Sequence, residues 1–183
     1  QLYPKIDLHF ELTDRRVDLV GEGFDCALRG GALADSTLRA RHVAQSEFGL
    51  FASPDYLRQA PPLESIEDLR LHDCLLFAPE ASNEVVWRLV SKNQKREYRP
   101  SGGFRTNNLN LILKLALMGQ GITTLPRFFG SPCVSDKTLV RVLPEWATRR
   151  SPISLVYPAM PYRSKRLEVF LDFMSARLRA LTW

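Results

Sequence analysis

The feature that most constrains the fold is a repeated change in the spacing of apolar residues, from every second residue to every third or fourth. Residues Ile6 to Leu12 place apolar side chains at alternate positions, which is typical of a half-buried strand. Residues Leu109 to Leu117 carry apolar side chains at helical spacing and stop before Gly119. Because strand and helix patterns alternate along the chain, the sequence predicts an α/β fold with mainly parallel sheets and right-handed crossovers.

Local signals place further elements between these two segments. Ser53 and Pro54 predict the start of a short helix, since serine caps the amino end and proline suits the first turn. Ser65 and Asp68 predict a capping box at the start of another. Two alternating stretches around a polar bend at 91–95 predict a β-hairpin. Further strands are expected at 24–29, 47–53, 74–77, 121–126, 140–142 and 153–157, a short helix around 128–129, and an amphipathic helix at 167–178.

Composition narrows the class of protein. Of the 183 residues, 45% are apolar and 25% are charged, which is ordinary for a globular protein that buries a core. No apolar run approaches the roughly 20 residues that cross a bilayer, and three cysteines without a CxxC motif predict reduced thiols, so a cytoplasmic protein is expected. The net charge of +5 is not gathered into a dense basic cluster with interleaved aromatic residues, so this segment is not expected to bind nucleic acid.

Catalytic machinery is not recognisable in the sequence. The chain contains no GxSxG elbow, no phosphate-binding GxxxxGK[ST] loop, no HExxH motif and no GxGxxG motif that opens a helix. His9, His42 and His72 are isolated from one another in the sequence, and none forms a metal-binding motif with acidic or cysteine residues. We therefore expect a protein that is not an enzyme, with no cofactor and no bound metal.

Candidate ligand-binding residues follow the ends of predicted strands, where open α/β sheets gather their ligands. Thr106, Asn107 and Asn108 come after a strand through Phe104 and precede a helix, whose amino end favours anions. The same three residues can instead only cap that helix, and Asn108 fits a pure cap best. At the ends of two other predicted strands, Arg29 is a candidate cation for a ligand and Phe77 a candidate apolar wall.

Each of these two residues also has a plainer reading. Arg29 can bind a ligand carboxylate, or it can pair with an internal acid such as Asp25 or Asp35. Phe77 can line a pocket or only pack in the core or at its rim.

The order of motifs over essentially the whole chain resembles the effector-binding domain of LysR-type transcriptional regulators. The segments that carry the resemblance are Tyr3-Pro4 before Ile6 to Leu12, Asp14-Arg15 with Val17 to Val20, Glu22 to Arg29, Asp35 to Arg41, Ala52 to Leu57, Asp68-Leu69 with His72, Ala116 to Ile122 with Leu125-Pro126, and Leu143 to Trp146 with Val156 to Pro158. The resemblance implies two Rossmann-like subdomains joined by a two-strand hinge, the architecture of type 2 periplasmic binding proteins. Subdomain I would comprise 1–50 and 153–183, and subdomain II 51–152. The winged helix-turn-helix and the first strand and helix of the effector domain would precede this segment.

The same resemblance implies a function. A small effector, commonly one with a carboxylate or aromatic group, would bind between the subdomains and shift the population of conformations. DNA would be bound only through the N-terminal domain that is absent here, and the intact protein would form a homodimer or homotetramer. The alternative is a periplasmic-type solute-binding protein with the same two-lobed closure, and a gene that begins with a helix-turn-helix would decide between them. An enzyme on this fold comes third.

Overall fold

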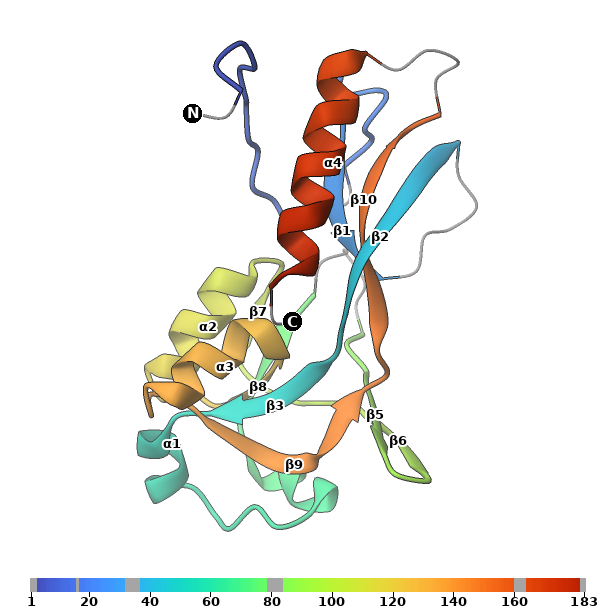
Figure 1. Cartoon of the computed structure of the whole chain (residues 1–183). Coiled ribbons are helices and arrows are strands. Elements are labelled where there is room, and N and C mark those ends of the chain that lie inside the picture. The colour runs from blue at the N-terminus through green and yellow to red at the C-terminus, as the bar shows by residue number, and fades with distance from the viewer. Residues whose placement is uncertain (1–2, 16, 32–36, 79–83, 160–163, 182–183) are drawn as a thin grey trace. The chain divides into compact units, whose positions relative to one another are not determined.

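The computed structural model describes residues 3–15, 17–31, 37–78, 84–159 and 164–181 (Figure 1). The chain folds into two compact units. Unit 1 consists of residues 1–13, 17–45 and 152–182, and unit 2 of residues 14–16, 46–151 and 183. The chain therefore passes between the units at 45–46 and at 151–152, and makes a brief excursion into unit 2 at 14–16.

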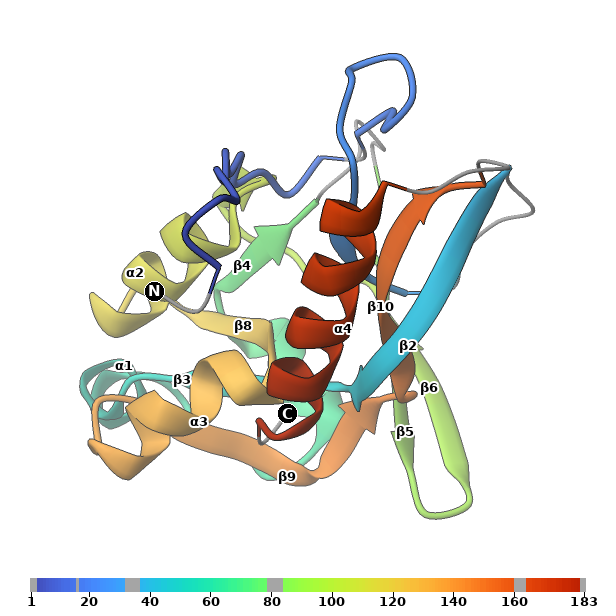
Figure 2. The same ribbon diagram turned by 45° about the horizontal axis from the view of Figure 1, so that its top comes forward.

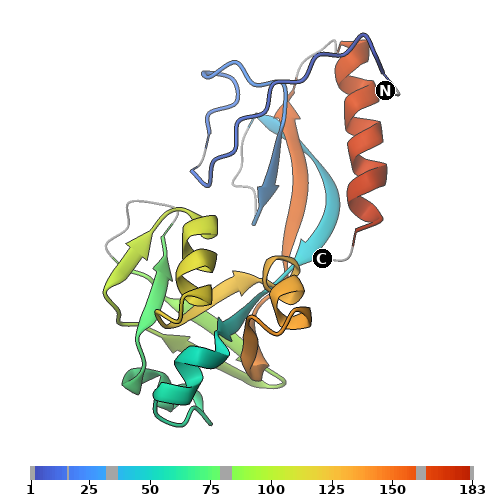
Figure 3. The same ribbon diagram turned by 90° about the vertical axis from the view of Figure 1, so that its left-hand side faces the viewer.

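Unit 1 is a three-stranded sheet with a long helix. The strands are β1 (Ala27–Gly30), β2 (Leu38–Ser46) and β10 (Ser151–Pro158), in the order β1-β10-β2, and β1 is antiparallel to β10. The C-terminal helix α4 (Lys165–Arg179) runs along this sheet (Figure 3). Its amino end is capped by Ser164, whose hydroxyl accepts from the Leu167 N–H at 3.4 Å. Leu167, Leu171 and Leu178 form its buried face, which confirms the predicted amphipathic helix.

The strand predicted at Ile6 to Leu12 is wrong. Residues 5–13 form no strand, and Leu8, Phe10 and Leu12 are exposed by 55%, 65% and 92%. Alternation marks a strand only when one face is buried and the backbone pairs with a neighbour. This segment forms no such ladder with the residues that the structure describes, so its apolar pattern does not produce a strand here.

Unit 2 contains a seven-stranded sheet with the order β6-β5-β9-β3-β8-β4-β7. The strands are β3 (Phe48–Ala52), β4 (Cys74–Phe77), β5 (Trp87–Ser91), β6 (Gln94–Tyr98), β7 (Phe104–Thr106), β8 (Ile122–Pro126) and β9 (Val140–Thr148). β5 and β6 form the predicted hairpin.

The prediction of mainly parallel sheets is wrong. β4 is parallel to β7 and to β8, whereas β3 is antiparallel to β8 and β9, and β5 to β6 and β9. The physical reason lies in the position of β3: helix α2 joins β7 to β8 and helix α3 joins β8 to β9, but β3 lies between β8 and β9 and runs in the opposite direction to both. Among the described strand pairs of unit 2, parallel pairing is confined to β4, which lies between β7 and β8.

The helices of unit 2 begin where the sequence predicts. α1 (Pro54–Gln59) starts at Ser53, whose hydroxyl accepts from the Tyr56 N–H at 3.2 Å. The short 3₁₀ helix η1 (Ile66–Leu71) starts at Ser65, whose N–H donates to the Asp68 carboxylate at 2.8 Å. α2 (Leu109–Leu117) and α3 (Arg127–Ser135) follow β7 and β8, and they pack on the same face of the sheet (Figure 2).

The core of unit 2 has two sides because side chains alternate across the sheet. In β3, Leu50 and Ala52 face one cluster and Phe51 faces the other, which explains why the strand is apolar throughout. The side under α2 and α3 is built from Phe51, Leu75, Ile112, Ala116, Leu125 and Leu139. The opposite side holds Leu50, Ala52, Ile66, Leu69, Cys74, Trp87, Leu89, Ile122, Val142, Leu143 and Trp146.

Candidate functional site

Two of the predicted residues meet at the carboxyl ends of neighbouring parallel strands in unit 2. Phe77, the last residue of β4, is the register partner of Thr106, the last residue of β7. The Ala78 N–H donates to the Thr106 carbonyl at 2.8 Å and extends this pairing by one residue. Helix α2 begins directly afterwards, so its amino end lies beside the two strand ends. This is the edge at which α/β sheets place their ligands, and we call these residues with Asn107 and Asn108 the strand-end site.

The polar residues of the strand-end site organise the start of α2. The Asn108 side-chain oxygen accepts from the Leu111 N–H at 2.9 Å, so Asn108 is the N-cap that the sequence suggests. The Asn108 N–H in turn donates to the Thr106 hydroxyl oxygen at 3.2 Å. This leaves the Thr106 hydroxyl proton able to donate to another group. The exposed Asn107 side chain forms no hydrogen bond with the described part of the chain.

A residue that the sequence analysis did not select also belongs to the strand-end site. The half-buried Asp14 comes from the short excursion of the chain into unit 2, and its carboxylate accepts from the Leu109 N–H at 2.9 Å. A carboxylate is stabilised there because the first N–H groups of a helix are free and carry partial positive charge. The anion-binding end of α2 is thus already occupied by an acid of the protein itself. The 95-residue separation of these partners explains why no local pattern reveals the contact.

The position of Phe77 is compatible with both roles considered for it, packing in the core and lining a pocket. Its side chain is half-buried and packs against the cluster under α2 and α3. It therefore contributes to the core, and its remaining exposed part provides apolar surface at the strand-end site.

Arg29 lies in unit 1, whereas the strand-end site lies in unit 2. It lies in β1, half-buried, opposite Ser154 of β10, and its guanidinium donates to the Val17 carbonyl. Among the described residues it forms no ion pair, and Asp35, one of its two suggested partners, lies outside them. A guanidinium carries five N–H donors, so the contact with Val17 orients the group and leaves others available to an anion.

Comparison with known proteins decides the family. Residues 1–179 match the family described as the LysR substrate binding domain. The chain belongs to the LysR substrate-binding domain family. That family and its fold, two Rossmann-like subdomains as in type 2 periplasmic binding proteins, agree with the resemblance carried by the motifs.

Relatives of this LysR domain are transcriptional regulators. The transcriptional activator TtdR of Escherichia coli is 33% identical over 174 residues, which are 95% of this chain and 56% of that protein. The regulatory domain of CrgA from Neisseria meningitidis is 34% identical with a TM-score of 0.78, covering 88% of this chain and 79% of that one. Full-length AphB of Vibrio cholerae is 26% identical with a TM-score of 0.82, covering 96% and 59%. The chain thus spans a little over half the length of such regulators.

Two further features of this LysR domain bear on the kinds of site it can hold. Within the ranges that the structure describes, no helix combines the length and the apolar character needed to cross a bilayer. Among the same residues, no three His, Cys, Asp or Glu side chains gather in a way that could hold a metal ion.

Proposed function

We propose that this chain is the effector-sensing domain of a LysR-type transcriptional regulator and that it binds a small carboxylate, with or without an aromatic ring. The observation that carries the proposal is the family match over residues 1–179, together with relatives that are named as transcriptional regulators. In the whole protein, DNA would be bound by an N-terminal helix-turn-helix domain outside this segment. A regulator of this kind acts on DNA, so the protein would be cytoplasmic. Its role would be to bind an effector and not to catalyse a reaction.

The proposed subdomains are those implied by the resemblance, 1–50 with 153–183 and 51–152. The passages of the chain between the compact units at 45–46 and 151–152 support a hinge of two consecutive strand pairs, β2 with β3 and β9 with β10. An effector that binds one arrangement of the subdomains better than another would shift the population toward it, by no more than its difference in affinity. In a homodimer or homotetramer this shift would change how the DNA-binding domains meet their operator.

The strand-end site gives the effector specific contacts. In this proposal the Thr106 hydroxyl and the Asn107 amide would donate to a carboxylate, the exposed part of Phe77 would supply apolar surface, and Asn108 would keep its role as N-cap of α2. Arg29 remains a candidate for a charged hydrogen bond with the same carboxylate. A second anion next to Asp14 is unfavourable, because like charges repel at short range. The effector carboxylate would therefore displace Asp14 from the Leu109 N–H.

This competition makes the proposal testable with matched variants. Small carboxylates that raise the melting temperature of the domain would be found first, since ligands that bind only the folded state stabilise it by mass action. Calorimetric titration of a carboxylate found in this way should show tighter binding to D14N than to wild type, and weaker binding to T106A and R29A. Equal affinity in all four proteins would refute the site assignment. The regulatory role would be refuted if the intact protein failed to bind DNA upstream of any gene.

A further inference from the structure

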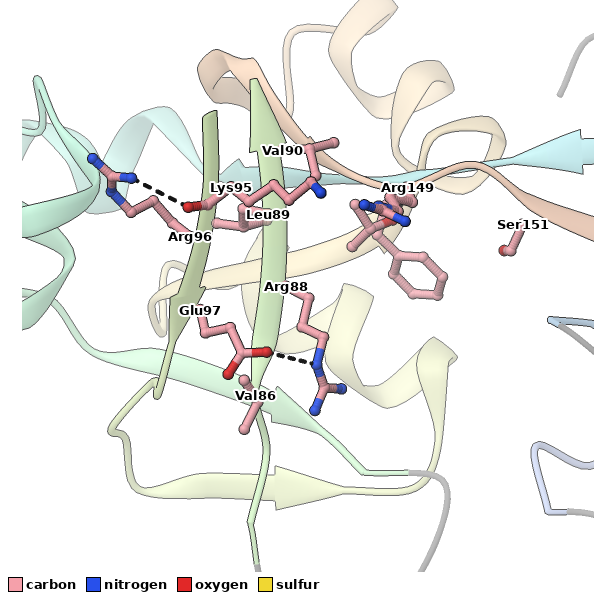
Figure 4. Close-up of a pocket in the computed structure, with 11 residues that line it drawn as sticks. Val86, Arg88, Leu89, Val90, Lys95, Arg96, Glu97, Arg149 and Ser151 are labelled. Carbon is pink, nitrogen blue, oxygen red and sulfur yellow. Dashed lines mark hydrogen bonds and ion pairs between the residues drawn. The ribbon is translucent and has the colours of Figure 1, made fainter. Parts of the chain in front are cut away.

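We infer that unit 2 carries a second ligand site, for small organic anions with an apolar body, at the opposite edge of its sheet from the strand-end site. The site is a pocket of about 590 Å³ formed by the β5–β6 hairpin and the 148–151 segment that joins β9 to β10 (Figure 4). We call it the hairpin pocket. Its volume falls in the range of about 300 to 1,000 Å³ that small-molecule sites occupy. In the strand order β6-β5-β9-β3-β8-β4-β7, the hairpin and the pair β4-β7 lie at the two ends.

Strand geometry decides which hairpin side chains share a face. Arg88 is opposite Glu97 and Val90 is opposite Lys95 in the register, and alternation places these four residues on one face. Figure 4 shows the Lys95 side chain reaching across β5 toward Val90, whereas Arg96 points the other way. The ammonium group of Lys95 is thus directed into the pocket from the outermost strand of the sheet.

The charge of the hairpin pocket is unbalanced. Arg88 is held by Glu97, with 3.0 Å between the guanidinium Nε and the carboxylate. Lys95 and Arg149 also line the pocket, and neither has an acidic partner among the residues that the structure describes. Two cations without a partner beside low-dielectric walls attract anions and form charge-assisted hydrogen bonds with them.

The floor of the hairpin pocket is apolar and fixed. Phe48, Val86 and Val90 line it and are each half-buried, which leaves part of each side chain exposed to a ligand. The Phe48 N–H donates to the Thr148 hydroxyl at 2.8 Å and ties the floor to the end of β9. An inorganic anion would gain nothing from this floor, whereas an aromatic or branched aliphatic carboxylate would bury its body there and place its charge between Lys95 and Arg149.

The test uses benzoate as the probe and the complete 183-residue chain. Calorimetric titration at constant ionic strength would compare benzoate with acetate, which lacks the ring, and with benzyl alcohol, which lacks the charge. We expect the double variant K95A/R149A to bind benzoate at least about tenfold more weakly than wild type, since each charged hydrogen bond contributes that much or more. Acetate and benzyl alcohol should both bind more weakly than benzoate.

Two controls distinguish binding at the hairpin pocket from binding elsewhere on the chain. R166A removes an exposed cation of unit 1 that has no acidic partner among the described residues, and it should leave the affinity for benzoate unchanged. T106A alters the strand-end site: weaker benzoate binding by T106A with wild-type binding by K95A/R149A would place benzoate at the strand-end site and refute the hairpin pocket, whereas weaker binding by K95A/R149A than by T106A would support it. Circular dichroism would confirm folding of each variant, and K95Q/R149Q, which keeps side-chain length, provides a second test of charge.

Four results would overturn the inference. These are the absence of benzoate binding to wild type, equal affinity of wild type and K95A/R149A, equal affinity for benzoate and acetate, and tighter binding of an acetylated hexaglutamate peptide than of benzoate. The last result would identify the hairpin pocket as a surface for acidic protein segments.

Discussion

Replacing Asp14 tests the contact that no local sequence pattern reveals. In the D14A variant the Leu109 N–H loses its carboxylate acceptor and the amino end of α2 loses its negative charge. A carboxylate at a helix amino end is worth about 0.3 to 1 kcal/mol when exposed and up to about 2 kcal/mol when partly buried. Asp14 is half-buried, so we expect the free energy of unfolding of unit 2 to fall by about 1 to 2 kcal/mol.

The loss can be measured by urea unfolding followed by tryptophan fluorescence. Trp87 and Trp146 are only 4% and 9% exposed and both lie in the core of unit 2, so their emission reports on the unit in which the contact is made. For a protein of this size the expected decrease corresponds to a melting temperature lower by about 2 to 8 °C. D14N keeps an oxygen acceptor without the charge, and it should lose about half as much stability.

The matched control is D7N, which alters an exposed acid in the same N-terminal stretch and should change stability by less than about 0.5 kcal/mol. If D14A and D7N unfolded with the same free energy, the carboxylate would contribute nothing to α2. Competition between Asp14 and an effector carboxylate would then have no basis.

Three further predictions concern groups outside the strand-end site. Y56F should lower the stability of unit 2 by about 1 to 2 kcal/mol in urea, because the Asp73 N–H, which donates to the tyrosine oxygen at 3.0 Å, loses its acceptor. Burial opposes ionisation of Glu47, but the hydrogen bonds from two arginines hold its pKa below the usual 4.5. The ionised carboxylate should therefore stabilise the fold above pH 4.5, and this stabilisation should disappear as the pH falls through the lowered pKa. In E47Q it should be absent at every pH. Burial raises the pKa of the Cys74 thiol to about 12, so mass spectrometry should find it alkylated more slowly than Cys133 in the folded protein.

Each of these predictions has a result that contradicts it. Unfolding of Y56F at the wild-type urea concentration would show that water replaces the hydroxyl at no cost. An acid-unfolding profile shared by E47Q and wild type would show that the two ion pairs of Glu47, which measure 2.9 Å and 3.3 Å, add nothing to stability. Equal labelling rates at Cys74 and Cys133 would show that the core of unit 2 opens and exposes Cys74 faster than the thiol is alkylated.

Much of the fold follows from local signals. Ser53, Ser65 and Asn108 each precede the first residue of a helix. The side chains of Ser53 and Asn108 accept from free N–H groups of the first turn, and the Asp68 carboxylate accepts from the Ser65 N–H. The hairpin is equally local, since its two strands are separated by a short polar bend. The family could also be recognised, because the order of short motifs persists over almost the whole chain.

The candidate residues of the strand-end site also rest on local signals, and such signals do not reveal contacts between distant segments. Thr106 to Asn108 could be selected because they connect a strand to a helix within a few residues. Asp14 could not be selected, because its partner at Leu109 is brought near only when the chain enters unit 2 at that point. The hairpin pocket likewise depends on the pairing of β5 with β9, which joins residues far apart in sequence.

The sequence alone determined where most helices and strands begin and end, because capping and apolar periodicity act over one or two turns. Only the tertiary structure decided that Ile6 to Leu12 forms no strand and that most strand pairs are antiparallel. Pairing depends on which backbone edges meet in space, and the apolar pattern of a single segment is the same whether or not a neighbour arrives to bond with it.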